Sequence, residues 1–345
     1  MTNPLQPIVD EPQSDLLATR LRQVMTELKT VIVGQDRVLE RVLVALLAGG
    51  HCLLEGVPGL GKTLTVSTLA RTLGGTFTRI QFTPDLLPSD IVGTRIYRPS
   101  TEGFDVELGP VFANFVLADE INRAPAKVQS ALLEAMGERQ ISIGGTTYRL
   151  PLPFLVLATQ NPIESEGVYP LPEAQRDRFL MRIPVDYPTA VEEHEIVDRS
   201  RRQTAAPASL LSTDDVASLQ TAAESVYVDR SVQDYAIRLV LATRNPSEHG
   251  VKIDGLLAYG ASPRASIGLV AAGRALALLR GRNHLLPQDV YDIAYDVLNH
   301  RLVLSFDAVA DGVTVDEVLI ELLTTVVAPR LSSSQLIEQR SPVGV

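Results

Sequence analysis

Apolar side chains recur along the chain with two different periods, and each period predicts one kind of secondary structure. Near the start, leucine and valine stand three and four positions apart, at Leu17, Leu21, Val24 and Leu28. This spacing predicts an amphipathic helix, and Ser14 just before it is a good N-cap. Residues 1–13 contain three prolines and show no period, so we expect a flexible arm there.

Between residues 50 and 190, short apolar runs alternate with helical patterns. The runs predict strands at 51–55, 76–82, 115–118, 154–159 and 179–185. Helical patterns lie between them at 62–73 and 124–136. Strands that alternate with helices predict an α/β fold, in which helices cover both faces of a parallel sheet. Two hairpin signals interrupt this order. Residues 104–108 alternate apolar and acidic side chains, and Gly144-Gly145 is a typical two-residue hairpin turn.

After Pro188 the pattern becomes almost entirely helical. A charged helix is predicted at 192–202, and further helices at 214–225, 232–243, 263–280, 287–302 and 315–326. We interpret Arg199, Arg201 and Arg202 as a solvated face of the charged helix. We therefore expect an α/β domain over residues 14–188, a linker and all-α domain over 189–330, and a tail over 331–345.

Composition narrows the function classes. Among the 345 residues, 41 are acidic and 31 basic, which gives a net charge of −10 and argues against a surface that binds nucleic acid or anionic lipid throughout. Cys52 is the single cysteine, and the histidines lack the spacing of metal ligands, so we expect neither a disulfide nor a structural metal. The apolar stretches fall short of the ~20 residues that span a bilayer. We expect a cytoplasmic protein without membrane insertion.

The strongest chemical signal is Gly56-Val-Pro-Gly-Leu-Gly-Lys62-Thr63, which matches the P-loop pattern G-x-x-x-x-G-K-[ST]. The motif lies between a predicted strand and a predicted helix, where its glycines let backbone N–H groups converge on phosphate oxygens. Lys62 would bind the β- and γ-phosphates, and the Thr63 hydroxyl would ligate Mg²⁺. We expect ATP to contact Gly56, Pro58, Gly59, Leu60, Gly61, Lys62, Thr63 and Leu64.

Two other predicted strands end in polar residues suited to ATP hydrolysis. The run at 115–118 is followed by Asp119 and Glu120. Asp119 would hold Mg²⁺, partly through water, and Glu120 would polarise the attacking water. The strand at 154–159 is followed by Gln160 and Asn161. The Asn161 amide is then placed to position water or to touch the γ-phosphate.

These motifs and several longer strings resemble the MoxR family of AAA+ ATPases. The strings are GVPGLGKT, ADEINRAPAKVQSALLEAMGERQ, ATQNP, LPEAQRDRF and YGASPRAS, and the resemblance extends over most of residues 14–330. It implies a P-loop domain with a C-terminal helical lid, a hexameric ring, and ATP bound between subunits. The two hairpins would face the ring pore or its rim.

The resemblance also implies roles for single residues. Val33 and Gly34 match the segment that touches adenine, and Asn161 matches sensor 1. Arg178 matches the arginine finger that reaches the neighbouring subunit's site. Arg176 stands where the family usually has an apolar residue, so the choice between these two arginines stays open.

Arg264 matches sensor 2 of the lid, and the residues around it independently support a phosphate contact. Ser262 and Pro263 form a strong helix start, which places Arg264 in the first turn beside the positive end of the helix dipole. Two positive features at one place suit an anion.

These features predict an enzyme that uses Mg²⁺ and ATP to remodel other proteins. Lys62, Arg264 and a neighbour's Arg178 would neutralise phosphate charge. The resemblance implies a protein client and a partner with a von Willebrand factor A domain. A chelatase-type motor subunit is an alternative. A nucleic-acid motor or transcriptional regulator is disfavoured by the net charge, and a small-molecule kinase by the arginine-bearing lid.

Overall fold

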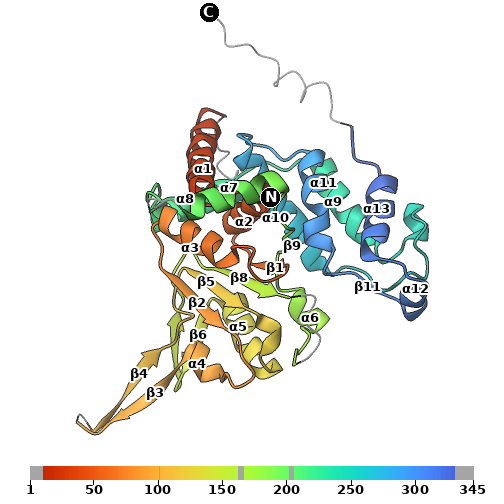
Figure 1. Cartoon of the computed structure of the whole chain (residues 1–345). Coiled ribbons are helices and arrows are strands. Elements are labelled where there is room, and N and C mark those ends of the chain that lie inside the picture. Colours follow the sequence, from red (N-terminus) through yellow and green to blue (C-terminus); the bar gives the residue numbers. More distant parts are fainter. Residues whose placement is uncertain (1–10, 101, 162–166, 202–205, 331–345) are drawn as a thin grey trace, which may run out of the picture.

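The computed structural model describes residues 11–100, 102–161, 167–201 and 206–330, and its centre is a five-stranded parallel sheet (Figure 1). The strands are β1 (Cys52–Glu55), β2 (Phe77–Gln81), β5 (Phe115–Asp119), β8 (Leu155–Gln160) and β9 (Met181–Pro184). They are ordered β2-β5-β8-β1-β9, and every neighbouring pair is parallel. All five carboxyl ends therefore lie along one edge, where the residues that follow the strands can meet. The predicted α/β class is confirmed.

The near-continuous apolar runs of these strands are explained by burial on both faces. On β5, Phe115 and Leu117 belong to one hydrophobic cluster, whereas Val116 and Ala118 belong to another. Successive side chains of a strand point to opposite faces, so each strand needs apolar residues at both parities. The helices of this part of the chain are α1 (Glu11–Val31), α2 (Asp36–Leu47), α3 (Lys62–Thr72), α4 (Pro88–Val92), α5 (Ala126–Glu138) and α6 (Glu173–Arg176).

The first helix begins earlier than its pattern predicts. It starts at Glu11, so Ser14 lies inside α1, where its exposed fraction is only 1%, and is not the N-cap. The predicted arm therefore overlaps the first turn of α1, and residues 1–10 lie outside the described residues. The apolar periodicity locates the buried stripe of a helix correctly but does not fix its polar first turn.

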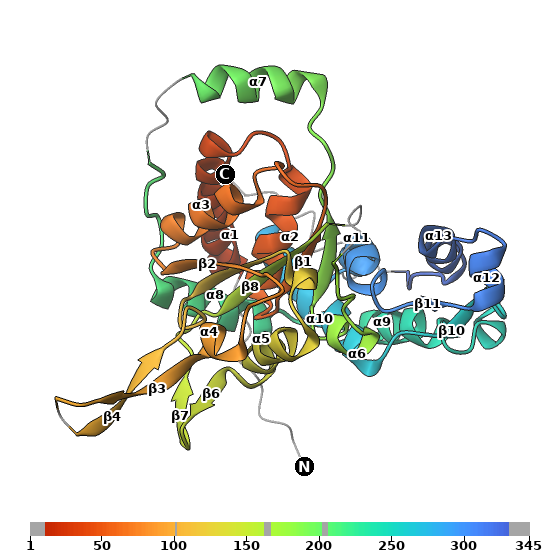
Figure 2. The ribbon, with the colours of Figure 1, turned by 60° about the horizontal axis from the view of Figure 1, so that its bottom comes forward.

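Two antiparallel hairpins extend from the same end of the α/β part (Figures 1 and 2). The first pairs β3 (Gly93–Arg98) with β4 (Gly103–Leu108), and the second pairs β6 (Gln140–Ile143) with β7 (Thr146–Arg149). Gly144 and Gly145 make the second turn with φ of +58° and +85°, which L side chains rarely adopt. Both hairpins were expected from the sequence, although β3 was not recognised as the partner of residues 104–108.

The second half of the described chain is mainly helical. Its helices are α7 (Ala190–Ser200), α8 (Thr213–Glu224), α9 (Arg230–Ala242), α10 (Pro263–Leu279), α11 (Pro287–Leu298), α12 (Phe306–Ala310) and α13 (Val315–Thr325). Hydroxyl caps start most of them, including Thr189, Ser212 and Ser262. The two short strands β10 (Leu257–Tyr259) and β11 (Val303–Leu304) form an antiparallel pair that the helical patterns did not predict. Figure 2 shows α7 lying apart from α9–α13.

The helical domain shares its core with the α/β domain. Helix α10 packs against α8, α9 and α11, and also against α1 and α2. One continuous hydrophobic cluster contains side chains from all of these elements and from one face of the sheet. A buried ion pair joins the same two parts, because Asp296 on α11 accepts hydrogen bonds from Arg37 (2.6 Å) and Arg41 (2.8 Å) on α2. Apolar packing and buried charge thus fix the two domains to one another.

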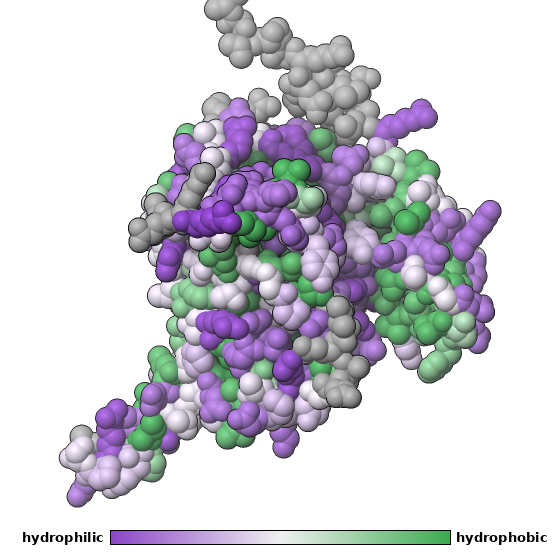
Figure 3. Space-filling model, viewed as in Figure 1, coloured by the Kyte–Doolittle hydropathy of each residue, from purple (hydrophilic) through white to green (hydrophobic). Residues whose placement is uncertain are grey.

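The outer surface of the helical domain carries exposed apolar side chains, at the right of Figure 3. They include Phe306, with an exposed fraction of 95%, and Val309, Ile320 and Val327. Within the described ranges, no helix is both long and apolar enough to cross a bilayer.

Candidate nucleotide-binding site

The loop between β1 and α3 folds as a phosphate cradle. Gly59 and Gly61 have φ of +89° and +73°, and Gly61 is the N-cap of α3. Gly56 is required for a different reason, because a Cβ there would lie 2.6 Å from the carbonyl oxygen of Val185 on the segment after β9. The loop therefore curls tightly against the sheet edge just before α3, the conformation in which backbone N–H groups can converge on phosphate oxygens.

Lys62 is the first residue of α3, and its ammonium group is held inside the loop. Its Nζ donates a hydrogen bond of 2.6 Å to the Gly56 carbonyl oxygen. Partial burial lowers the pKa of Lys62, although the negative charges of Asp119, Glu120 and Glu55 oppose this shift. The three carboxylates keep a cation favourable here, so Lys62 is a stable point charge for phosphate oxygens.

Asp119 and Glu120 stand at the end of β5, directly beside the cradle. The Thr159 hydroxyl on β8 donates to Asp119 Oδ1 over 2.6 Å and accepts from the Glu120 backbone N–H over 2.8 Å. Glu120 has a positive φ of +55°, a backbone conformation that L side chains rarely adopt. One threonine thus fixes both carboxylates relative to the central strand.

Two further residues of the site come from β2 and were not predicted from the sequence. Arg79 donates to Asp119 Oδ2, and Gln81 Nε2 donates to Glu120 Oε2 over 2.9 Å. Arg123 also contacts Glu120 Oε2, with 2.9 Å from its Nε. The only sequence signal was the presence of polar side chains at alternate positions of an apolar run. That β2 lies next to β5 becomes visible only in the folded sheet.

These groups surround one cavity of about 440 Å³. Its lining consists of Gly56, Pro58–Leu64, Arg79, Asp119, Glu120, Thr159, Gln160 and Asn161. The hydroxyl of Thr63 and the carboxylate of Asp119 are hard oxygen donors, which is the donor type that Mg²⁺ selects. The residues that the motifs predicted around the phosphates therefore lie together, and their chemistry fits a Mg²⁺–phosphate ligand.

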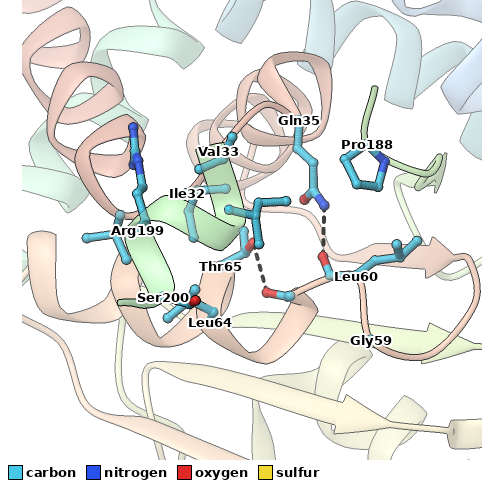
Figure 4. Close-up of a pocket in the computed structure, with 13 residues that line it drawn as sticks. Ile32, Val33, Gln35, Gly59, Leu60, Leu64, Thr65, Pro188, Arg199 and Ser200 are labelled. Carbon is cyan, nitrogen blue, oxygen red and sulfur yellow. Dashed lines mark hydrogen bonds between the residues drawn. The ribbon is translucent and has the colours of Figure 1, made fainter. Parts of the chain in front are cut away.

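A second, mainly apolar cavity of about 360 Å³ adjoins the loop (Figure 4). Val33, Leu60 and Leu64 line it, as does Gln35, whose Nε2 donates to the Leu60 carbonyl over 2.8 Å. Val33 therefore lines an apolar cavity beside the phosphate loop, and its contact with adenine stays a prediction. Gly34 does not line this cavity. It has a φ of +64°, and a Cβ there would lie 2.2 Å from Oε1 of Glu192.

Helix α7 closes this second cavity. Ile196, Arg199 and Ser200 line it together with Pro188. The interpretation as a solvated face was wrong for Arg199, because its Nη1 donates to the carbonyls of Lys29 (2.9 Å) and Thr30 (2.7 Å) at the end of α1. Arg201 is exposed as expected, and Arg202 lies outside the described residues. Burial of a long guanidinium stem against another helix cannot be read from charge spacing along one helix.

The remaining predicted arginines lie elsewhere in the chain. Arg178 is exposed and donates to the Leu133 carbonyl on α5 over 2.7 Å, and Arg264 contacts Asp177 at 3.5 Å. Neither lines the phosphate cavity. Arg176 is half-buried, and its Nη2 lies 3.8 Å from Glu173. Arg264 therefore does not line the cavity that contains Lys62, and its contact with phosphate stays a prediction.

The fold and the cradle define a P-loop nucleotide-binding protein with a helical C-terminal domain. Residues 51–181 match the model of the ATPase family associated with various cellular activities (AAA), and residues 253–322 match the AAA lid domain. The chain is 57% identical over 314 residues to "Chaperone MoxR1" of Mycobacterium tuberculosis. The matched region covers 91% of this chain and 83% of that protein. The chain belongs to the MoxR family of AAA+ ATPases.

Two other relatives agree with this assignment. "Protein MoxR" of Paracoccus denitrificans is 38% identical over 304 residues, covering 83% of this chain and 89% of that protein. A crystal structure of a protein from Cytophaga hutchinsonii, proposed to be an ATPase, is 47% identical with a TM-score of 0.88. The superposition covers 93% of this chain and 98% of the Cytophaga protein's chain. The resemblance identified from the sequence motifs is confirmed.

Proposed function

We propose that this protein hydrolyses ATP to ADP and phosphate with Mg²⁺, in an assembly in which one subunit completes the site of the next. The observation that carries the proposal is the convergence of Lys62, Thr63, Asp119, Glu120 and Asn161 on one cavity. Bound Mg²⁺ would neutralise charge on the β- and γ-phosphates, held by Thr63 and, partly through water, by Asp119.

The chain's own groups divide the remaining work. The loop amides and Lys62 bind phosphate oxygens, and Glu120 accepts a hydrogen bond from the attacking water and orients it. Asn161, at the end of β8, contacts the γ-phosphate or that water. The apolar cavity beside Val33 takes the adenine, and α7 excludes solvent from it.

Assembly is supported by the positions of Arg178 and Arg264, which do not line the phosphate cavity of their own chain. Arg178 is exposed, and the side chain of Arg264 has an exposed fraction of 57%. Each is available to a second molecule, whose cavity carries one lysine and one arginine among the described residues that line it. Repeated head-to-tail contacts would close a ring, and a hexamer is the form expected for the family. In such a ring the nucleotide cavity of one subunit would face the surface of its neighbour that carries Arg178 and Arg264, called here the arginine edge.

The work done by hydrolysis is proposed to be remodelling of a protein client. Its support is the name of the M. tuberculosis relative, a chaperone. The exposed apolar side chains of the helical domain, such as Phe306 and Val309, and the protruding hairpins offer surfaces for protein contacts. A partner with a von Willebrand factor A domain and a cytoplasmic location belong to the same proposal.

The test is the ATPase rate per subunit as a function of protein concentration. The rate of the wild type should rise as assemblies form. Glu120→Gln should still bind ATP but hydrolyse it about 100-fold more slowly, since it lacks the group that activates water. Arg178→Ala should be inactive alone and regain activity in mixtures with Glu120→Gln. A concentration-independent rate from a stable monomer would contradict the proposal, and capture with ATP-loaded Glu120→Gln would identify the client.

A further inference from the structure

A single carboxylate joins the segment that carries Arg178 to the helix that carries Arg264. Asp177 follows α6 directly, and its two carboxylate oxygens accept hydrogen bonds from the Ser262 hydroxyl over 3.0 and 2.8 Å. Ser262 is at the same time the N-cap of α10, because its Oγ accepts the Arg264 backbone N–H over 3.2 Å. Asp177 thus reaches the start of α10 through the group that caps it.

The other side of Asp177 is fixed by a buried arginine. Arg301, which follows α11, donates from Nε to Asp177 Oδ1 over 2.8 Å, and only 3% of its side chain is exposed. Its Nη2 also donates to the Phe179 carbonyl over 2.7 Å. Burial lowers the pKa of Arg301, and the charge of Asp177 opposes that shift. A buried guanidinium therefore holds both the side chain of Asp177 and the backbone after it.

Arg264 itself is held much more loosely. Its Nη1 lies 3.5 Å from Asp177 Oδ2, at the limit of a hydrogen bond, and its side chain remains 57% exposed. An exposed pair of this length contributes little energy. The tight contacts of Asp177 therefore fix the start of α10 and the segment that carries Arg178. The Arg264 guanidinium, in contrast, stays free to move to a stronger anion.

We propose that Asp177 is a positioning residue for ATP hydrolysis, which presents Arg178 and Arg264 to the neighbouring subunit's phosphates as one unit. This inference rests on the function proposed above. Displacing a charged group by about 1 Å from its productive position can cost around 100-fold in rate, so a carboxylate that sets the position of two arginines would have a large effect without touching ATP. In this proposal Asp177 acts on the arginine edge, which contacts a neighbouring subunit, and it does not line the cavity of its own chain.

The experiment uses mixed assemblies of full-length variants. Asp177→Ala alone should lose between 10- and 100-fold in ATPase rate. An equal mixture of Asp177→Ala with Glu120→Gln should recover about a quarter of the wild-type rate, because one interface in four then pairs an intact cavity with an intact edge. A mixture of Asp177→Ala with Arg178→Ala should show no such recovery, because both variants damage the same edge.

Controls separate positioning from misfolding. Asp177→Ala should bind ADP at low protein concentration with an affinity within threefold of the wild type, and Asp177→Asn, which keeps an acceptor for Ser262, should retain an intermediate rate. Asp311→Asn, an exposed aspartate after α12, should behave as the wild type. A wild-type rate for Asp177→Ala, or no recovery with Glu120→Gln, would overturn the inference. If Arg178→Ala also fails to recover with Glu120→Gln, the shared site itself is contradicted.

Discussion

Arg79 and Asp119 form an ion pair inside the phosphate cavity, with 3.0 Å from Nε and 2.6 Å from Nη2 to the same carboxylate oxygen, Oδ2. Asp119 is the carboxylate expected to hold Mg²⁺. The arginine therefore competes with Mg²⁺, or with its water shell, for that oxygen.

Removing this competitor should strengthen Mg²⁺ binding. The Arg79 side chain is 48% exposed, so the pair is worth on the order of 1 kcal/mol at most, which corresponds to about a fivefold change. Arg79→Ala should lower the Mg²⁺ concentration needed for half-saturation by up to this factor. The measurement is a calorimetric Mg²⁺ titration of the complex with a non-hydrolysable ATP analogue. Arg98→Ala, which breaks an exposed pair with Asp105 in the first hairpin, is the matched control. An unchanged Mg²⁺ titration would show that the pair opens freely.

The contact between α7 and α1 predicts a selective loss of base affinity. Arg199→Ala removes two hydrogen bonds to the end of α1 and part of the wall of the apolar cavity. We expect Kd for ATP to rise about tenfold, since charged hydrogen bonds of this kind contribute roughly 1.5 to 3 kcal/mol, reduced here by partial exposure. Inorganic tripolyphosphate, which has no base, should bind as before. Arg201→Ala, at an exposed position on the same helix end, should change neither affinity. Equal losses for both ligands would mean that α7 does not contact the base.

His51 predicts a loss of stability in acid. Its Nδ1 accepts the Val156 backbone N–H over 3.0 Å inside the sheet, and burial lowers its pKa from 6.5 to about 4. As the pH falls from 6.5 to 4, the unfolded chain takes up a proton that the folded chain excludes. The free energy of unfolding should therefore decrease over this window, by about 3 kcal/mol from this residue.

The check is denaturant unfolding at several pH values. His51→Asn keeps an acceptor near the Val156 amide but cannot be protonated. It should be less stable at neutral pH and should lose less stability on acidification than the wild type. Buried His300, whose pKa is also lowered well below its ordinary value by burial, contributes equally to both proteins. Parallel pH profiles would contradict the assignment to His51.

Cys52 should report on global opening of the sheet. The thiol lies on β1 between β8 and β9, has no exposed surface, and has a pKa raised by burial. Only the thiolate reacts with disulfide reagents, so the folded protein should be unreactive. In the denatured protein, Cys52 should attack the reagent and release one equivalent of the reagent's own thiolate. The labelling rate under native conditions should follow the global unfolding equilibrium. Rapid labelling without denaturant would show local opening at β1.

The sequence predicted the parts of the fold that depend on neighbours along the chain. Burial on both faces made the central strands continuous apolar runs, and the P-loop motif located the cradle to the residue. Gly144 and Gly145 identified a hairpin turn because few other residues adopt their conformation. Each of these signals lies in or next to the segment whose structure it predicts.

What the sequence left undetermined depends on strand order and on helix docking. Arg79 and Gln81 join the site because β2 lies beside β5, and the pairing brings Gln81 opposite Asp119, although the two are far apart in the sequence. Arg199 joins it because α7 docks on α1. The placement of Arg264 beside Asp177 follows from packing of α10 on α1 and α2, which no local pattern reports.

That packing has a mechanical consequence. Because α10 shares one continuous hydrophobic core with α1, α2 and the sheet, and Asp296 ties α11 to α2, swinging the helical domain on a hinge would expose apolar surface and an unpaired buried charge. Each subunit is then expected to move as one body that carries the nucleotide cavity, Arg178 and Arg264 together. In the proposed assembly, a displacement that follows hydrolysis would then occur between subunits, at their contacts, and not between the two domains of one subunit.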